Sequence, residues 1–379
     1  MRKEYLLAPG PTQVPPEVLL EMAKPVFHHR TAEYRKLHED TLGALKAVFR
    51  TSNDVFISSS SGTGSMETAV CNVLGPGDKA IAIQGGKFGE RWVELCESFG
   101  AETIVIDVQW GKPVDPEAVR KALKQNPGVK AVYATLVETS TGAVADIEAL
   151  GAVVKETDAL LVVDGISSVG AIPCETDAWA IDMLVVGSQK ALMMPPGLSF
   201  ITVSPKAWAV IDAHKPAAYY FDLKLARKAM KTFDNPWTPA VMLVLALKKA
   251  LDIIIQRGVE QVWQDTRRLA EATRAAAKAI GLELYADPPA DCVTAITLPD
   301  GIDGEKLVKI MRIDNGVTVA GGQSQLKGKI VRISHMGYVG DYDVIIGISA
   351  LEMLLAQMGY EFEMGAGVRA AQQVLARQA

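Results

Sequence analysis

Two short apolar runs in the middle of the chain each lead into a polar residue, and they constrain the fold more than any other feature. Residues 160–163 are followed by Asp164, and residues 183–186 run through Gly187-Ser188-Gln189 into Lys190. A short uninterrupted apolar run is typical of a strand buried on both faces of a parallel sheet. Open α/β sheets bind ligands at the carboxyl ends of their strands. We therefore expect Asp164 and Lys190 to form the chemical centre of a site.

Strand-like and helix-like segments alternate around these runs. The predicted strands are 55–57, 79–83, 103–108, 129–136, 160–163, 183–186 and a returning strand at 198–203. The predicted helices between and after them are 66–70, 91–99, 116–124, 147–155 and 207–213. This alternation predicts an α/β fold with a mainly parallel sheet that is covered by helices on both faces.

The two ends of the chain depart from this alternation. Residues 1–16 are rich in proline and glycine and predict an extended N-terminal arm. Two helices are predicted after the arm, one at 16–23 and one that ends near residue 49. Two long helices are predicted at 240–255 and 259–280. The remaining segments predict a smaller C-terminal α+β domain, whose last segment, 362–379, is a peripheral helix. The other segments of this domain are 282–285, 293–298, 304–314, 317–319, 330–334 and 341–358. We expect a large domain over 17–245 and a small one over 246–379.

Composition excludes several classes of partner. The net charge is -5, and the absence of a Lys/Arg block argues against nucleic acid and anionic membrane surfaces. No apolar run approaches the roughly 20 residues of a membrane span. Four scattered cysteines predict free thiols in a reducing compartment, and Pro9-Gly10-Pro11 comes too early for a signal peptide, so we expect a cytoplasmic protein. Adjacent His28 and His29 have no Cys or carboxylate at ligand spacing, which favours a surface or substrate-channel loop over a metal site.

Three further strand ends carry polar or aromatic residues. A Ser/Gly-rich turn over 58–65 opens onto a helix, which indicates either an anion cradle or simply a well-capped helix start. It matches neither the P-loop nor the dinucleotide-binding glycine pattern. Phe88 lies in a glycine-flanked loop ahead of the predicted helix 91–99, where it could stack on a flat ligand or anchor the core. Thr139 belongs to the polar loop 138–142.

One ligand would use all of these groups together, namely pyridoxal 5'-phosphate (PLP). Its aldehyde forms a Schiff base with a lysine, whose amine becomes nucleophilic when burial lowers its pKa. Its ring nitrogen needs a carboxylate, its flat ring needs a stacking partner, and its phosphate suits a helix N-terminus. Lys190, Asp164, Phe88 and the turn at 62–65 match these four needs.

The same segments carry a family resemblance over about residues 5–358. The ordered motifs are APGPTQVP, HHRTAEY, SSGTGSME, GGKFGERW, ETSTG, VVDGISSVG, GSQKALMMPPG, NPWTP and KIVRISHMG. This series resembles the class V (fold type I) PLP-dependent aminotransferases, in particular the alanine/serine–glyoxylate (serine–pyruvate) branch. The resemblance implies the fold type I architecture: a mainly parallel central sheet with helices on both faces, plus a smaller C-terminal α+β domain.

The resemblance also implies roles for individual residues. Lys190 would form the Schiff base and Asp164 would pair with the pyridinium. The other implied cofactor contacts are Thr63, Gly64, Ser65 and Gln189 at the phosphate, Phe88 and Ile166 on the two ring faces, and Thr139 at the phenolic oxygen. In this family a homodimer shares its sites, and Asn235 and Thr238 lie in the motif that completes the partner's phosphate site. Arg332 would bind the substrate α-carboxylate, and the backbone around Gly10 would line the substrate pocket. The better-known eukaryotic relatives have His where Ser65 stands.

The implied activity is transfer of an amino group from alanine or serine to glyoxylate or pyruvate by a ping-pong mechanism, with the freed Lys190 amine moving the α-proton. Another small substrate, such as phosphoserine or 2-aminoethylphosphonate, stays open, with His28, His29 and Arg30 as candidate extra contacts. A non-catalytic PLP-binding accessory protein also stays open. A cysteine desulfurase is disfavoured because the loop 321–328 has no Cys, and a nicotinamide dehydrogenase is disfavoured because its glycine fingerprint is missing.

Overall fold

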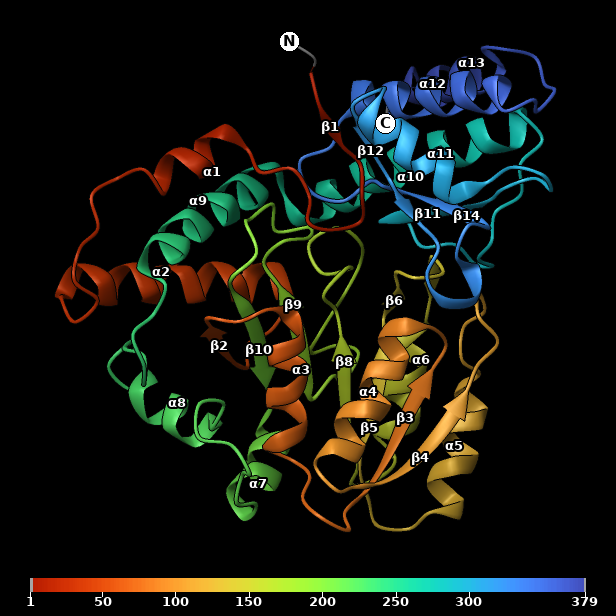
Figure 1. The fold of residues 1–379 in the computed structure, drawn as a ribbon. Coiled ribbons are helices and arrows are strands. Elements are labelled where there is room, and N and C mark those ends of the chain that lie inside the picture. The colour runs from red at the N-terminus through yellow and green to blue at the C-terminus, as the bar shows by residue number, and fades with distance from the viewer. Residues whose placement is uncertain (1–2, 378–379) are drawn as a thin grey trace.

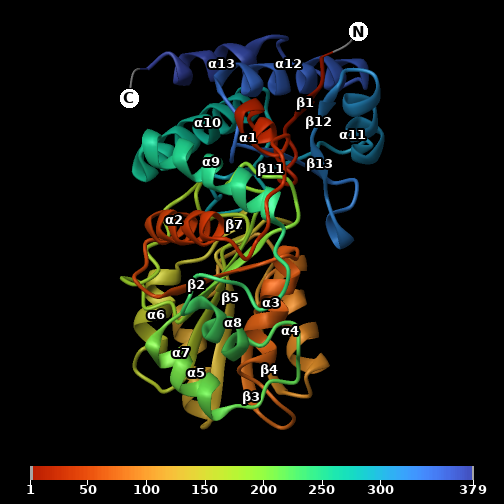
Figure 2. The same cartoon turned by 90° about the vertical axis from the view of Figure 1, so that its left-hand side faces the viewer.

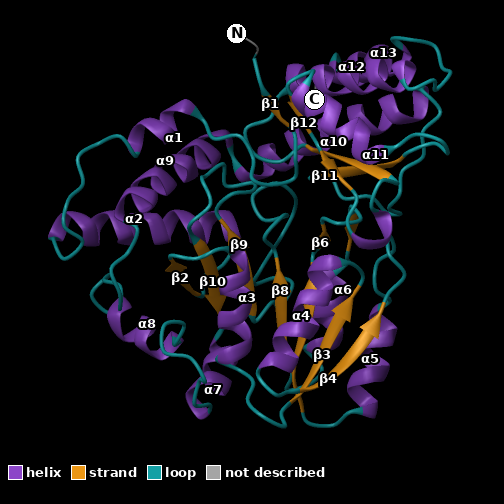
Figure 3. Cartoon of the chain, viewed as in Figure 1, coloured by secondary structure: helices purple, strands orange, loops and turns teal. Residues whose placement is uncertain are grey.

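A seven-stranded sheet forms the centre of the protein in a computed structural model that describes residues 3–377 (Figures 1 and 3). The strand order is β2-β10-β9-β8-β5-β3-β4. The bounds are β2 Asp54–Ser58, β3 Lys79–Gln84, β4 Glu102–Asp107, β5 Val129–Thr135, β8 Leu160–Asp164, β9 Met183–Gly187 and β10 Ser199–Val203. Strand β10 is antiparallel to both of its neighbours, and the other adjacent pairs are parallel. The predicted mainly parallel sheet is confirmed.

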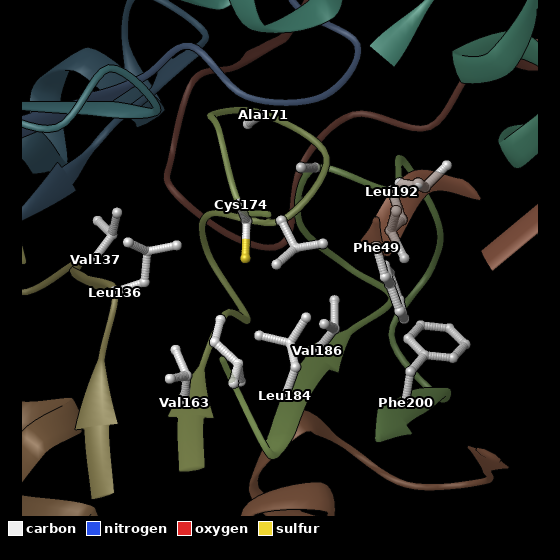
Figure 4. Close-up of a cluster of buried hydrophobic side chains, with 14 of the residues drawn as sticks. Phe49, Leu136, Val137, Val163, Ala171, Cys174, Leu184, Val186, Leu192 and Phe200 are labelled. Atoms are coloured by element: carbon white, nitrogen blue, oxygen red, sulfur yellow. The ribbon is translucent and has the colours of Figure 1, made fainter. Parts of the chain in front are cut away.

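Helices cover both faces of this sheet because alternate strand residues point to opposite sides. In β8, Leu161 and Val163 face one apolar cluster, whereas Leu160 and Val162 face another. Figure 4 shows part of the first cluster, where the ring of Phe200 in β10 lies beside that of Phe49. Helices α2 (Ala32–Phe49), α5 (Pro116–Gln125), α6 (Ile147–Val154) and α9 (Val241–Arg257) contribute to the first cluster. Helices α3 (Gly62–Cys71), α4 (Lys87–Ser98), α7 (Pro205–Ala213) and α8 (Leu223–Met230) contribute to the second.

The C-terminal part forms a smaller α+β unit above the carboxyl ends of the strands (Figures 1 and 2). Its antiparallel sheet has the order β11-β14-β13, with β11 Val293–Thr297, β13 Ala320–Gly321 and β14 Ile330–Ser334. Its helices are α10 Val259–Ala279, α11 Gly304–Ile313, α12 Asp341–Gln357 and α13 Ala366–Leu375. In the predicted segment 282–285, Leu284 forms an isolated bridge to Ile296. No helix within residues 3–377 is long and apolar enough to cross a membrane.

The last helix packs more closely against the small domain than the prediction of a peripheral helix implied. Helix α13 packs against α10 and α12, and its Ala371 is fully buried. The final two residues of the predicted segment 362–379 lie outside the described residues.

Helix α9 spans the expected domain boundary at residue 245. It packs along α2 and α1 (Pro16–Glu21), and Leu251 and Ile254 in its second half belong to the same apolar cluster as Phe49. We therefore propose that the junction between the domains lies at Gly258, between α9 and α10.

The N-terminal arm connects the two domains. Its strand β1 (Tyr5–Leu6) pairs in parallel with β12 (Val317–Thr318), and the carbonyl oxygen of Leu7 accepts a hydrogen bond of 2.8 Å from the Ser334 amide. Farther along, the Thr12 hydroxyl donates to the carbonyl oxygen of Lys190 at 2.8 Å. The arm thus joins the small sheet to the loop after β9.

Candidate active site

A cavity of about 280 Å³ lies at the carboxyl ends of the central strands. It brings together many of the residues singled out in the sequence from six separate segments of the chain. Those that line it are Gly10, Thr63, Phe88, Thr139, Asp164, Ile166, Gln189 and Lys190. The strand-end pattern therefore located one shared pocket.

Lys190 has an enclosed amine that is partly deprotonated near neutral pH. Burial lowers the pKa of this amine to about 8, although nearby Asp164 acts in the opposite direction. Its Nζ donates a hydrogen bond to the carbonyl oxygen of Pro9 in the arm. The next residue, Gly10, has a positive φ of 124°, and a Cβ there would overlap the Lys190 side chain. The arm can approach the amine this closely because position 10 is glycine.

Asp164 is a buried carboxyl group at the end of a central strand. It ends β8 and is 4% exposed, and its Oδ1 accepts a hydrogen bond of 2.8 Å from the Ile166 amide. Burial raises the pKa of Asp164 to about 7, with a smaller contribution from the negative charge of Glu138. Within the described chain, its Oδ2 accepts no hydrogen bond. A protonated ring nitrogen in the cavity would satisfy this oxygen and favour the ionised carboxylate.

Helix α3 begins at Gly62, not at the predicted residue 66, so the glycine-rich turn itself forms the first helical turn. Ser61 precedes it without a side-chain cap, and although the Gly64 amide donates to the Ser61 carbonyl oxygen at 2.9 Å, the amides of Gly62 and Thr63 are available to an anion. Thr63 lines the cavity, whereas Gly64 and Ser65 do not. Ser65 is 1% exposed, and its hydroxyl donates to the Ser199 hydroxyl at 2.7 Å. The Ser65 side chain is therefore occupied within the protein.

Phe88 lies in the first turn of α4, because this helix begins at Lys87. The prediction of a loop at Phe88 and a helix start at Arg91 is wrong, and Glu138 explains why. The Glu138 carboxylate accepts hydrogen bonds from the amides of Phe88 at 3.1 Å and Gly89 at 2.9 Å. It thus caps α4 from a distant loop, and this long-range contact leaves no local signal in the sequence. The Phe88 ring centroid lies 6.0 Å from the Lys190 Nζ.

Glu138 is a functional residue that the sequence reasoning missed. It is almost fully buried, accepts a further hydrogen bond from the Ser140 hydroxyl, and has its pKa raised by burial. Its amide contacts position the helical turn that carries Phe88. The only available signal was an acidic residue at the start of the polar strand-end loop 138–142.

Arg332 ties the small domain to the rim of the site. It lies on β14, is 6% exposed, and does not line the cavity itself. Its Nε and Nη2 donate to the carbonyl oxygen of Gly321, and its Nη1 donates to that of Thr139 at 2.7 Å. Burial lowers the pKa of the guanidinium to about 10, so it stays cationic at neutral pH. A guanidinium has five N–H groups, so each terminal nitrogen keeps one for a carboxylate.

Asn235 and Thr238 do not reach this cavity within one chain. The Tyr34 hydroxyl donates to Asn235 Oδ1 at 2.8 Å, which holds the loop against α2. Thr238 lines a separate open pocket of about 530 Å³ together with His28 and His29, whose rings stack 4.7 Å apart. The two histidines thus lie in a surface loop away from Lys190.

The four cysteines are all buried and unpaired. Cys292 is the thiol whose charge acts on Lys190, and burial raises its pKa to about 12. A thiol with such a pKa is almost entirely protonated at neutral pH, which makes it a poor nucleophile.

Comparisons with known proteins agree with this geometry. The family model described as "Aminotransferase class-V" matches residues 4–344. The chain is 42% identical to a protein of Synechococcus named soluble hydrogenase, small subunit, over 98% of both chains. It is 35% identical to the serine–glyoxylate aminotransferase of Methylorubrum extorquens, over 98% of this chain and 96% of the relative.

A solved structure extends the agreement to three dimensions. Ureidoglycine–glyoxylate aminotransferase from Bacillus subtilis superposes with a TM-score of 0.95 at 28% identity, covering 99% of this chain and 98% of the other. The family model covers most of the sequence, and the neighbour's fold extends over nearly all of the structure. This chain belongs to the class V aminotransferases.

Proposed function

We propose that the protein is a PLP-dependent transaminase that moves an amino group from a small amino acid, alanine or serine, to glyoxylate or pyruvate. The observation that carries this proposal is the shared cavity in which an amine of lowered pKa, Lys190, accompanies a buried carboxyl group with an open oxygen, Asp164. Bound PLP would supply an electron sink and would store the amino group between the two half-reactions.

The residues in and around the cavity fit both the ring and the phosphate of PLP. Lys190 would bind it covalently, Asp164 would pair with its ring nitrogen, and Phe88 and Ile166 would pack on its ring. Thr139, whose hydroxyl donates to that of Ser167 at 2.6 Å, would contact the phenolic oxygen. The phosphate would meet Thr63, the amides around Gly64, and Gln189. The Gln189 amide makes no hydrogen bond within the described chain, and its buried Oε1 lies unpaired, so the side chain is available to a ligand.

The chain's own groups then divide the work of the reaction. The amine of Lys190, once released, is basic enough to take the proton from the substrate α-carbon and acidic enough to return it, because its pKa lies near neutral pH. Arg332 would orient the substrate by holding its α-carboxylate between two terminal N–H groups. The arm backbone at Pro9 and Gly10 would form the wall beside the amine.

The substrate assignment rests on two kinds of support. The serine–glyoxylate aminotransferase of Methylorubrum extorquens and the ureidoglycine–glyoxylate aminotransferase of Bacillus subtilis both have glyoxylate in their names. The α-carboxylate that Arg332 would bind is common to amino acids and 2-oxo acids, so the same residue would serve donor and acceptor in turn.

We also propose a homodimer in which each chain completes the partner's phosphate site with Asn235 and Thr238. In one chain these residues do not line the Lys190 cavity but line a separate pocket. Exposed apolar side chains lie near them, including Tyr219, Tyr220 and Phe233. The four unpaired thiols support a reducing, cytoplasmic location.

A half-reaction screen tests the proposed function. Purified protein loaded with PLP is mixed with single amino acids, and conversion of the cofactor from its aldehyde to its amine form is followed by absorbance. We expect conversion by alanine or serine and reversal by glyoxylate or pyruvate. Conversion only by phosphoserine or 2-aminoethylphosphonate would instead support a different transaminase. Cofactor binding without any conversion would support an accessory protein.

A further inference from the structure

Arg91 contacts two side chains of the site but has no role in the assignment above. It lies in α4, one turn after Phe88, and it lines the same cavity as Lys190. Its Nη1 donates to the Thr63 hydroxyl oxygen at 3.2 Å. Its guanidinium carbon also lies 5.2 Å from the centroid of the Phe88 ring. One cation therefore contacts both the expected phosphate cradle and the expected stacking residue.

Arg91 has no carboxylate in direct contact among residues 3–377, although its charge lowers the pKa of Asp164 in the same cavity. The charged residues that line the cavity are Arg91, Lys190 and Asp164. The phenolic oxygen of the cofactor would balance the charge of a protonated Schiff base at Lys190, and Asp164 would pair with the ring nitrogen, so Arg91 is left to balance the phosphate.

The hydrogen bond from Arg91 also sets the direction of the Thr63 hydroxyl. A hydroxyl group has a single proton and two acceptor lone pairs. Because the Thr63 oxygen accepts from Arg91, its own proton is free to be donated elsewhere. Thr63 stands in the uncapped first turn of α3, so that donation can go to an anion at the helix N-terminus.

We propose that Arg91 is a phosphate-recognition residue, which supplies the cationic charge opposite the cofactor phosphate and holds the Thr63 hydroxyl as a donor to it. This inference rests on the proposed PLP-dependent function. It means that Arg91 makes the protein bind PLP more tightly than pyridoxal, which has the same ring without the phosphate.

The test compares two ligands that differ only in the phosphate. Dissociation constants for PLP and for pyridoxal are measured with the full-length apoprotein, by protein fluorescence, for wild type, Arg91→Gln and Arg91→Lys. Lys87→Gln is the control, because it makes the same charge change on the same helix, where Lys87 pairs with Glu90 outside the cavity. Circular dichroism checks that each variant is folded.

We expect Arg91→Gln to weaken PLP binding roughly tenfold to a hundredfold, as for loss of a charge-assisted hydrogen bond, and to leave pyridoxal binding unchanged. Arg91→Lys should restore part of the loss, and inorganic phosphate should protect wild type from thermal unfolding more than Arg91→Gln. Equal weakening of both ligands would overturn the inference, since it would mean that Arg91 only supports Phe88 or the fold. Unchanged PLP binding would overturn it as well. A wild type that binds neither ligand would instead refute the proposed cofactor, and the inference with it.

Discussion

The groups expected to do the chemistry and those expected to recognise the ligands are placed in different ways. The groups expected to do the chemistry are Asp164 and Lys190, which follow adjacent parallel strands of one buried sheet. The groups expected to recognise substrate and phosphate come from remote segments, with Arg332 on the small sheet and Asn235 and Thr238 on a loop outside the Lys190 cavity. The reactive groups thus follow buried strands of the central sheet, while the groups expected to recognise substrate and phosphate lie on segments outside that sheet.

From this difference we expect that mutations can impair chemistry and ligand recognition separately. A change at the chemical groups should abolish turnover whatever the substrate, because the strands β8 and β9 supply groups that nothing else replaces. A change at the recognition groups should alter affinity, and its effect should depend on substrate or on a second chain. The following experiments can break or sharpen this division.

The largest effect is expected at Lys190. Lys190→Ala should abolish transamination and the absorbance band of covalently bound cofactor, because the amine is both the attachment point and the proton carrier. Lys36→Ala, which removes an exposed lysine paired with Asp40 on α2, should behave like wild type. Activity of the Lys190 variant close to wild type would refute the assignment of Lys190 to the chemical step.

The next effect is expected at Asp164. Asp164→Asn keeps the size of the side chain but removes its charge, and it should lower turnover on the order of 10²- to 10³-fold, as expected when a buried charge loses its partner. Steady-state rates and the cofactor spectrum measure this loss. Asp158→Asn, at the exposed turn before β8, is the matched control. A loss confined to KM would place Asp164 on the recognition side.

Arg332 should affect binding more than chemistry. Arg332→Lys keeps the charge but removes the fork of paired donors, so KM should rise roughly tenfold to a hundredfold for both donor and acceptor. The ratio of kcat to KM for each half-reaction provides the measurement, with Arg120→Lys on the exposed face of α5 as control. An equal fall in kcat with unchanged KM would count against substrate binding by Arg332.

The pH dependence tests the Lys190 amine directly. Because its folded pKa is lowered to about 8, the neutral amine should predominate above that pH and decline about tenfold per pH unit below it. The rate at which apoprotein captures PLP should follow this fraction, rising towards pH 8 and then levelling off. Stopped-flow absorbance measures the rate. A rate that continues to climb to about pH 10 would indicate an ordinary lysine.

The smallest effect is expected at the shared loop. Thr238→Ala should weaken PLP binding only a few-fold, as expected for one lost hydrogen bond. Mixing refolded Lys190→Ala chains with Asn235→Ala/Thr238→Ala chains should then give more activity than the separate variants, because a mixed dimer contains one intact site. No gain on mixing, together with a monomeric mass in solution, would argue that the site is complete in one chain.

Much of the fold was predictable because it depends on local patterns. The apolar runs before Asp164 and Lys190 mark strands whatever surrounds them, and the returning strand at 198–203 was placed within a residue of β10. Strand ends also predicted that Phe88, Thr139 and Thr63 would share one cavity.

What could not be predicted depends on contacts between distant segments. The start of α4 is set by the Glu138 carboxylate, which lies some fifty residues later in the chain. Arg91 looked like an ordinary helical residue until its contact with Thr63 appeared. The segment at 282–285 runs beside β11, with backbone hydrogen bonds from Tyr285 to Ala295 and from Thr297 to Glu283, but it forms only an isolated bridge at Leu284. The homodimer and the substrate depend on partners outside the chain, which local sequence patterns do not describe.

The N-terminal arm has a consequence for reading genes of this kind. The next methionine after Met1 is Met22, so a translation start assigned there would still encode every strand of the central sheet. The product would nevertheless lack β1 and Gly10, together with the Pro9 carbonyl that accepts from Lys190. Such a misassigned open reading frame would carry all the signature motifs from HHRTAEY onward and yet yield a protein with an unfinished wall beside its lysine.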